Sequence, residues 1–380
     1  MQAARISLAL VLLAACGSSG NGSSPPSDAG AGTDGSVVPP NPVPPPFDGG
    51  VDPVVSTFTF VGCNRLQGSN WTQADNPSSA NLPQLQQTFA DIVALPTTPK
   101  QLFFTGDLVI GLRSDVQKWL KPELDAWAAL WKADPIAAKV PLVPMVGNHE
   151  VLADDVGNGT EAPNPASHAV WTAWIAANGW DTHAGNGPTN APPNADALND
   201  DQSRMSYSFD DGDTHFVLLN TDTWTASNEL GWVALSWLEA DLTAAQANAN
   251  VARVFVFGHK PVLAPSGSTS AFEAVNAKLA TKMIQALDGH AKVKAYFAAH
   301  AHQWSTKKLP GSRGVLQVVA GNGGSMPDGS FKPGFYGFTE ARIHASGSIT
   351  IVSHERPIPN PYYAGPATPA TASTQLVIAP

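Results

Sequence analysis

The sequence contains little charge and little cysteine. Charged residues make up only 14% of the 380 positions, the formal net charge is -10, and no cluster of Lys and Arg occurs. This composition argues against a nucleic-acid-binding surface, which needs concentrated positive charge. The only two cysteines, Cys16 and Cys63, could form one disulfide at most. Hydrophobic residues reach 43%, which is enough for a large core.

The first 16 residues have the features of a secretory signal. Arg5 precedes an apolar run from Ile6 to Leu13 that is too short to span a membrane as a helix. The ending Leu-Ala-Ala-Cys resembles a bacterial lipoprotein signal, in which Cys16 becomes the lipidated first residue. An ordinary signal with an incidental cysteine is the alternative. The resemblance implies an exported lipoprotein of the cell envelope, anchored to the membrane through Cys16, and leaves Cys63 without a disulfide partner.

Two stretches of biased composition flank the expected folded domain, 54–355. Residues 17–53 are almost wholly Gly, Ser, Pro, Asp and Val. Such a segment cannot bury enough apolar surface to offset its ordering entropy, so we expect a disordered tether. Residues 356–380 are rich in Pro, Ala and Thr, and we expect a loosely ordered tail.

Strands and helices alternate through the domain. The apolar patterns predict βαβαβ order at the start, with strands at 56–61, 102–106 and 141–146 and helices at 82–95 and 114–132. This order implies parallel strands with right-handed crossovers. Further on they predict a hairpin at 206–219, helices at 169–178, 231–245 and 272–287, and strands at 251–257 and 293–298. Strands at 315–320 and 343–352 are expected to be antiparallel and to close a second sheet.

Four of the predicted strands end at polar side chains. Asp107 follows Gly106, Asn148-His149-Glu150 follows Gly147, His259 follows Gly258, and His300-Ala301-His302 follows the strand at 293–298. In open α/β sheets the ligand crevice lies outside the carboxyl ends of the strands. We therefore expect these groups to meet at one rim and to form a metal site.

Taken together, Gly-Asp, Gly-Asn-His-Glu, Gly-His and His-x-His resemble the calcineurin-like metallophosphoesterase family over residues 57–352. Tyr207-Ser208-Phe209 and the helix around Trp237 are similar to its purple-acid-phosphatase-like branch. The resemblance implies an α/β fold of four layers, a sandwich of two mixed sheets flanked by helices in the order α/β/β/α. It also implies hydrolysis of a small-molecule or lipid phosphoester.

The resemblance further implies two divalent metals, which clamp the phosphoryl group and activate a water. The expected ligands are Asp107 as the bridge, with Asn148, His259 and His300 on one metal and His302 on the other. Imidazole combined with hard oxygen favours Zn, Fe, Mn, Ni or Co over Ca. His149 is expected to donate a proton to the leaving oxygen or to stabilise charge. Glu150 is expected to orient the ligands.

The first strand departs from the family pattern. The family has Asp-x-His at this point, and its purple-acid-phosphatase-like branch has Asp-x-Gly. This chain has Cys63-Asn64-Arg65 instead. A Cys63 thiolate can bind Zn, and Asn64 is a weaker candidate. Arg65 cannot ligate because its guanidinium stays protonated, but it could contact a substrate phosphate. Two functions stay open: a metal-dependent phosphoester hydrolase with an altered metal site, and a noncatalytic binding lipoprotein that keeps the fold.

Overall fold

The computed structural model describes residues 51–157, 159–189, 196, 198, 200–265, 273–327 and 334–380. The predicted signal with Cys16, and the predicted tether up to residue 50, lie outside the described residues. Among the described residues, no helix is both long enough and apolar enough to cross a membrane.

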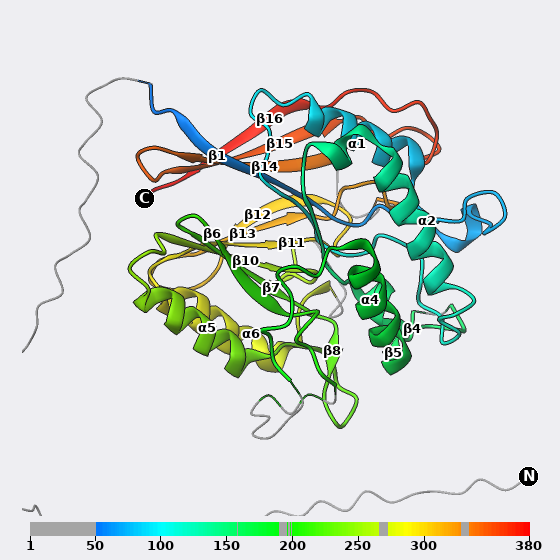
Figure 1. The fold of residues 1–380 in the computed structure, drawn as a ribbon, viewed down its shortest axis with the longest axis horizontal. Coiled ribbons are helices and arrows are strands. Elements are labelled where there is room, and N and C mark those ends of the chain that lie inside the picture. Colours follow the sequence, from blue (N-terminus) through cyan, green and yellow to red (C-terminus); the bar gives the residue numbers. More distant parts are fainter. Residues whose placement is uncertain are drawn as a thin grey trace, which may run out of the picture. The chain divides into compact units, whose positions relative to one another are not determined.

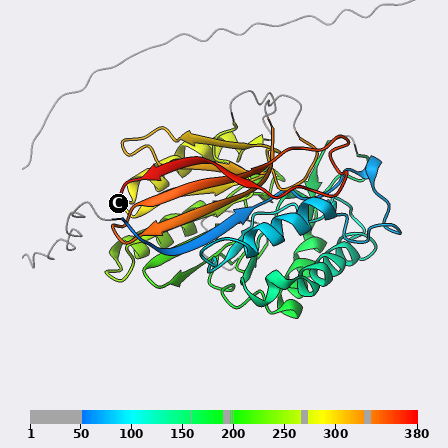
Figure 2. The same cartoon turned by 90° about the horizontal axis from the view of Figure 1, so that it is seen from above.

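The first large sheet has six strands in the order β16-β15-β14-β1-β2-β3. As predicted, β1 (Val54–Val61), β2 (Leu102–Phe104) and β3 (Leu142–Pro144) run parallel. The antiparallel part consists of β14 (Tyr336–His344), β15 (Ile349–Arg356) and β16 (Thr371–Ile378). Figure 2 shows these strands side by side, from red β16 to blue β1.

The second large sheet has the order β12-β13-β11-β10-β7-β6. Its parallel strands are β7 (Thr214–Leu219), β10 (Arg253–Gly258), β11 (Val293–Ala298) and β13 (Leu316–Ala320). Its antiparallel edges are β6 (Tyr207–Asp211) and β12 (Trp304–Lys308). The predicted hairpin at 206–219 is therefore confirmed as β6 and β7.

An aromatic core lies between the two sheets. Phe58 of β1 packs against rings from both sheets, with centroid distances from 5.0 to 6.0 Å to Phe103, Phe216, Phe255, Phe257 and Phe297. The outer face of the first sheet is covered by α1 (Leu82–Val93) and α2 (Leu120–Ala133), and α4 (Pro165–Asn178) packs on α2. On the second sheet, α5 (Leu235–Ala247) and α6 (Ala277–Gly289) cover the outer face (Figure 1). The α/β/β/α sandwich is confirmed.

Several predicted boundaries were wrong. The strand expected at 343–352 is the end of β14, a turn through Gly347 and the start of β15, all in the first sheet. Asp52 accepts hydrogen bonds from Ser346 and Ser348, which stabilises that turn. The helix expected from residue 231 begins at Leu235, because Leu230–Trp232 (β9) pairs with Thr223–Trp224 (β8).

The tail expected to be loosely ordered contains β16. This strand pairs with β15, and Leu376 and Ile378 pack onto the core between the sheets, which provides the apolar burial that orders the segment. The remaining short elements are the helix α3 (Asn148–Val151), the strands β4 (Leu152–Ala153) and β5 (Ala162–Pro163), and the 3-10 turns η1 (Gly68–Asn70) and η2 (Pro135–Ala138).

Candidate metal centre

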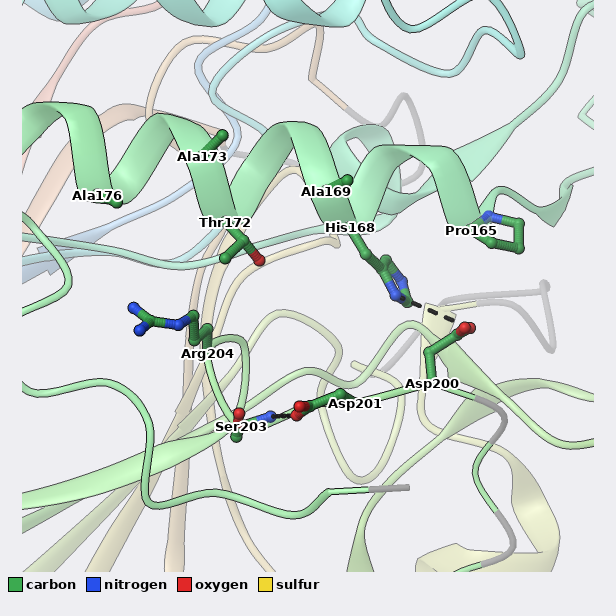
Figure 3. Close-up of a pocket in the computed structure, with 10 residues that line it drawn as sticks. All are labelled: Pro165, His168, Ala169, Thr172, Ala173, Ala176, Asp200, Asp201, Ser203 and Arg204. Carbon is green, nitrogen blue, oxygen red and sulfur yellow. Dashed lines mark hydrogen bonds and ion pairs between the residues drawn. The ribbon is translucent and has the colours of Figure 1, made fainter. Parts of the chain in front are cut away.

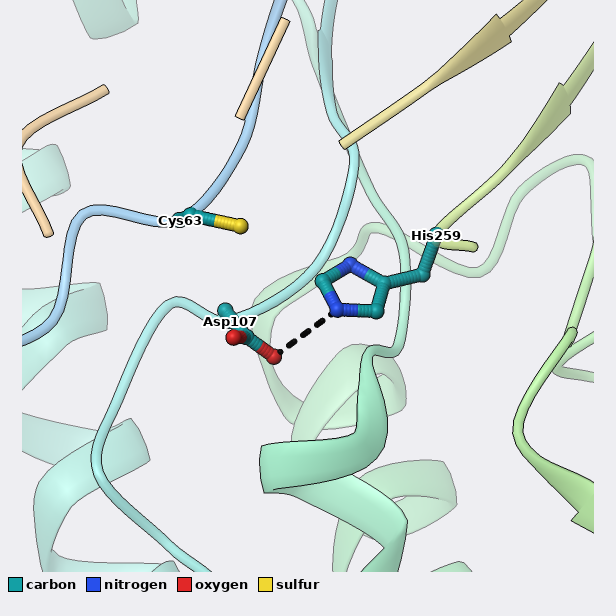
Figure 4. A group of neighbouring side chains, drawn as sticks. All are labelled: Cys63, Asp107 and His259. Atoms are coloured by element: carbon teal, nitrogen blue, oxygen red, sulfur yellow. Dashed lines mark ion pairs between the residues drawn. The ribbon is translucent and has the colours of Figure 1, made fainter. Parts of the chain in front are cut away.

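The predicted site residues follow the carboxyl ends of strands from both sheets. Cys63 follows β1, Asp107 follows β2 and Asn148 follows β3, while His259 follows β10 and His300 follows β11. Figure 4 shows Cys63, Asp107 and His259 reaching toward one another from three of these strand ends. The structure thus brings together groups that are far apart in the sequence.

Four atoms that could act as metal ligands form a compact cluster. His259 Nε2 lies 3.1 Å from Asp107 Oδ1 and 3.1 Å from Asn148 Oδ1. His300 Nδ1 lies 3.1 Å from His259 Nε2 and 3.2 Å from Asn148 Oδ1. Donors around a tetrahedral metal with bonds near 2.0 Å are about 3.3 Å apart, so this spacing fits the first coordination shell of a transition metal.

The hydrogen-bonding state of these four ligand atoms also calls for a cation among them. His259 Nδ1 lies 2.7 Å from the Thr105 carbonyl oxygen, which can only accept, so Nδ1 carries the hydrogen. In the neutral ring, Nε2 then presents a lone pair to Asp107 Oδ1 and Asn148 Oδ1, which are themselves acceptors. Three acceptors facing one another repel unless positive charge lies between them. The residues present therefore fit a divalent metal at this position.

Burial and mutual charge shift the pKa values of this pair in opposite directions. Burial would raise the pKa of Asp107, but His149 and His259 hold it well below its usual range. Burial would lower the pKa of His259, but Asp107 raises it to about 9. Asp107 is therefore a carboxylate, and without a metal a proton on His259 supplies the positive charge.

The backbone at this rim is strained and is supported by Glu150. Cys63, Asp107 and His300 have φ of 58°, 56° and 59°, a left-handed conformation that is uncommon for residues other than glycine. The buried carboxylate of Glu150 accepts from the N–H groups of Asp107 at 2.9 Å and Gly147 at 2.8 Å. Burial and the nearby Asp107 raise the pKa of Glu150 to about 7. Its contacts hold the two loops that carry Asp107 and Asn148.

Gly147 permits the close approach of these loops. A Cβ at this position would lie 2.5 Å from Asp107 Oδ1 and 2.8 Å from His259 Cε1. The glycine before Asn148 is therefore a packing requirement of the site.

His149 lies on the other side of Asp107. Its Nδ1 contacts the Ile110 carbonyl, and its Nε2 lies 3.8 Å from Asp107 Oδ2. Burial and the charge of Arg65 lower the pKa of His149 to about 3, so the ring is neutral at neutral pH. Because Nδ1 donates to a carbonyl, Nε2 is the atom that can accept a hydrogen bond in the site.

The residues of the divergent first motif have distinct positions. Arg65 Nε lies 3.3 Å from Asp107 Oδ2. Cys63 is fully buried, and its Sγ lies within 4.8 Å of an Asp107 oxygen and a His259 nitrogen. Burial and Asp107 raise the pKa of this thiol well above its usual range. Asn64 donates to the Gly323 carbonyl at 2.7 Å, so its amide holds a neighbouring loop. The ligand roles of Cys63 and Asn64 stay predictions.

His302 lines a cavity of about 300 Å³ beside this centre, together with Arg65, Asp107, His300 and Glu273. Its Nδ1 lies 2.8 Å from the Met326 carbonyl oxygen. Burial and the charge of Arg65 lower the pKa of His302 to about 4. Nε2 of the neutral ring is therefore available to a ligand.

Sequence reasoning missed two polar residues behind Asn148, namely Glu161 and Lys260. Asn148 Nδ2 donates to Glu161 Oε1 at 2.5 Å, and buried Lys260 pairs with buried Asp222 at 3.2 Å between Nζ and Oδ1. Lys260 directly follows His259 and could have been noticed from that adjacency. Glu161 lies in a segment without a clear pattern, and only the fold places it beside Asn148.

A second cavity, of about 700 Å³, lies between α4 and the segment 200–204. Its lining includes His168, which lies 3.8 Å from Asp200 (Figure 3). None of the predicted metal ligands lines this cavity.

Comparison with known proteins supports the same fold and chemistry. The family described as "Calcineurin-like phosphoesterase" matches residues 59–304. No curated protein matches the chain at a significant level.

The solved structures that are similar to this chain include the following three. PhoD is 12% identical with a TM-score of 0.53, over 86% of this chain and 70% of PhoD. A dimetal phosphatase from Danio rerio is 14% identical with a TM-score of 0.49, over 86% and 99% of the two chains. A phosphopantetheinyl hydrolase from Mycobacterium tuberculosis is 11% identical with a TM-score of 0.36, over 72% and 90%. At these identities the likeness concerns the fold.

Proposed function

The chain belongs to the calcineurin-like phosphoesterase family and is a metal-dependent phosphoester hydrolase; we propose that its reaction takes place at the cluster of Asp107, Asn148, His259 and His300. The centre we propose has two cation positions: this cluster, and an altered position bounded by Cys63, Asn64, Arg65 and His302. The observation that carries this proposal is the convergence of potential metal-ligand atoms on His259 Nε2, at 3.1 Å from both Asp107 Oδ1 and Asn148 Oδ1.

Divalent metal bound there would polarise the phosphoryl group and lower the pKa of a water. The protein holds Asp107 and Asn148 in place through the Glu150 carboxylate, which binds the backbone of both loops. His149 presents Nε2 beside Asp107, where it would accept a hydrogen bond from the water or from a phosphate O–H group. The proton-donor role expected from the sequence requires prior protonation of this ring, which its burial opposes.

The proposed substrate is a small-molecule or lipid phosphoester. The cavity beside Asp107 is lined by Arg65 and His302, so a phosphate would lie next to the metal ligands and a guanidinium. The N-terminal sequence supports export and anchoring through Cys16, which would place this site in the cell envelope.

The deciding experiment measures turnover of an aryl phosphate and an aryl phosphodiester by the purified chain, stripped of metal and reloaded with Zn, Mn, Fe, Co or Ni. We expect turnover that depends on the added ion. We expect His149→Ala to lower kcat by about 10²- to 10³-fold, the usual cost of removing one positioned hydrogen-bonding group from an active site, with metal content unchanged. No turnover with any ion would overturn the proposal and favour the noncatalytic binding function.

A further inference from the structure

Asp107 offers its two oxygens to different groups. Oδ1 lies in the four-atom cluster, 3.1 Å from His259 Nε2. Oδ2 faces away from that nitrogen and lies 3.3 Å from Arg65 Nε. A carboxylate can bridge two metals through one oxygen or through both, and a guanidinium at Oδ2 places positive charge beside either arrangement. Here the second oxygen is already bound to a permanent cation.

Arg65 is held in this position by the backbone around it. Arg65 forms an isolated β-bridge with Ala80, and the N–H of Leu66 donates to the Ser79 carbonyl at 2.8 Å. The N–H of Asn64 donates to the Asp107 carbonyl at 3.1 Å. The Arg65 side chain is only 14% exposed. The guanidinium is therefore part of the built site.

A guanidinium cannot act as a metal ligand, and it repels a divalent ion placed at the same carboxylate oxygen. The uncharged groups nearby do not offset this positive charge. Asn64 donates through its amide nitrogen to the Gly323 carbonyl at 2.7 Å, and its buried Oδ1 has no hydrogen-bond partner among the described residues. His302 has Nδ1 on the Met326 carbonyl and keeps Nε2 available, but both of these ligand atoms are neutral, whereas Arg65 is a permanent cation beside Asp107 Oδ2.

We infer that this chain binds one metal ion and that the Arg65 guanidinium takes the place of the second, as a fixed cation that binds the substrate phosphate. This inference rests on the proposed function and specifies its altered half. Of the three guanidinium nitrogens of Arg65, Nε alone donates to an acceptor within the described part of the chain. The side chain also lines the cavity of about 300 Å³. The two terminal NH₂ groups form a planar pair of donors that matches two phosphate oxygens.

The first test is metal stoichiometry. The purified full chain is saturated with Mn²⁺, desalted, and analysed by elemental analysis and electron paramagnetic resonance. We expect one Mn per chain with the signal of an isolated ion. The double variant Cys63→Asp/Arg65→His replaces the cation with two donors, and we expect two Mn per chain with an exchange-coupled signal. Two coupled Mn ions in the unmodified chain would overturn the inference.

A matched control is Arg253→His. Arg253 is 11% exposed and pairs with Asp213 at the amino end of β10, the opposite end from His259. This variant tests whether the loss of any largely buried arginine changes metal binding. We expect it to bind one Mn per chain.

The second test measures the affinity of the metal-loaded protein for inorganic phosphate by calorimetry. We expect Arg65→Ala to weaken phosphate binding at least tenfold. Arg65→Lys keeps the charge but loses the paired donors, so we expect its phosphate affinity to lie between that of Arg65→Ala and that of the unmodified chain. Circular dichroism checks that both variants fold. Unchanged phosphate affinity in Arg65→Ala would contradict the inference.

The two proposals fail in different ways. One metal and tight phosphate binding without turnover would refute the hydrolase function and leave the Arg65 inference intact. Turnover with two metals per chain would support the hydrolase function and refute the Arg65 inference.

Discussion

Glu161 gives the sharpest prediction about how this centre is built. The Asn148 side chain has one acceptor and one donor end, and only the oxygen can bind a metal. The Glu161 carboxylate accepts from the amide nitrogen at 2.5 Å, which points Oδ1 toward His259 and His300. We predict that Glu161→Ala weakens metal binding by releasing this amide, although Glu161 itself touches no metal.

The magnitude follows from the hydrogen bond that is lost. A hydrogen bond to a charged group contributes about 1.5–3 kcal/mol, which corresponds to a loss of about 10- to 150-fold in metal affinity. The range of about 10- to 100-fold seen for residues that support metal ligands agrees. Glu161→Gln keeps an acceptor for the Asn148 amide, so we expect a loss of less than about tenfold, as for a neutral hydrogen bond.

The assay is competition between the protein and a chromophoric chelator for Zn²⁺ or Co²⁺. A double-mutant cycle with Asn148→Asp separates orientation from other effects, because both carboxylate oxygens can bind a metal in either orientation. When Glu161→Ala is combined with Asn148→Asp, we expect it to cost little further affinity. Equal losses from Glu161→Ala with and without the Asn148→Asp change, or no loss in Glu161→Ala alone, would refute the orientation argument.

Three other predictions concern stability and packing. Burial raises the pKa of Glu123 to about 7 in the folded chain from 4.5, so the stability linked to its protonation is full below about pH 4.5 and is lost as pH rises through 7. Glu123→Gln should therefore be more stable than wild type at pH 8 by up to about 3 kcal/mol and gain little at pH 4, measured by urea unfolding; the same pH dependence in both proteins would contradict this. Gly147→Ala should lose metal, because its Cβ would lie 2.5 Å from Asp107 Oδ1, whereas Gly289→Ala, with open space around it, should not; equal metal content in the two variants would refute the packing argument. Removal of metal with a chelator should lower Tm, and about 100-fold excess of metal over its Kd should restore about 2.7 kcal/mol of stability; a Tm unchanged by the chelator would show that the folded state holds no metal.

The local patterns predicted most of the fold because each depends on few residues. Leu85, Phe89 and Ile92 recur at helical spacing, and all are buried on one face of α1. Predictions failed where a partner distant in the sequence decides the outcome. β16 is ordered by pairing with β15, and the start of α5 is delayed because β9 pairs with β8.

In the candidate site, too, the sequence predicts some features and only the fold decides the others. The sequence by itself determined which chemical groups stand at the strand ends, since a buried strand that stops at a glycine before Asp107 or Asn148 must deliver a polar side chain to the rim. Only the tertiary structure decided which atoms face one another: the Arg65 guanidinium on Asp107, and Glu161 behind Asn148. The physical reason is that hydrophobic periodicity acts over a few residues, whereas the orientation of a side chain depends on charges and hydrogen bonds supplied by distant segments.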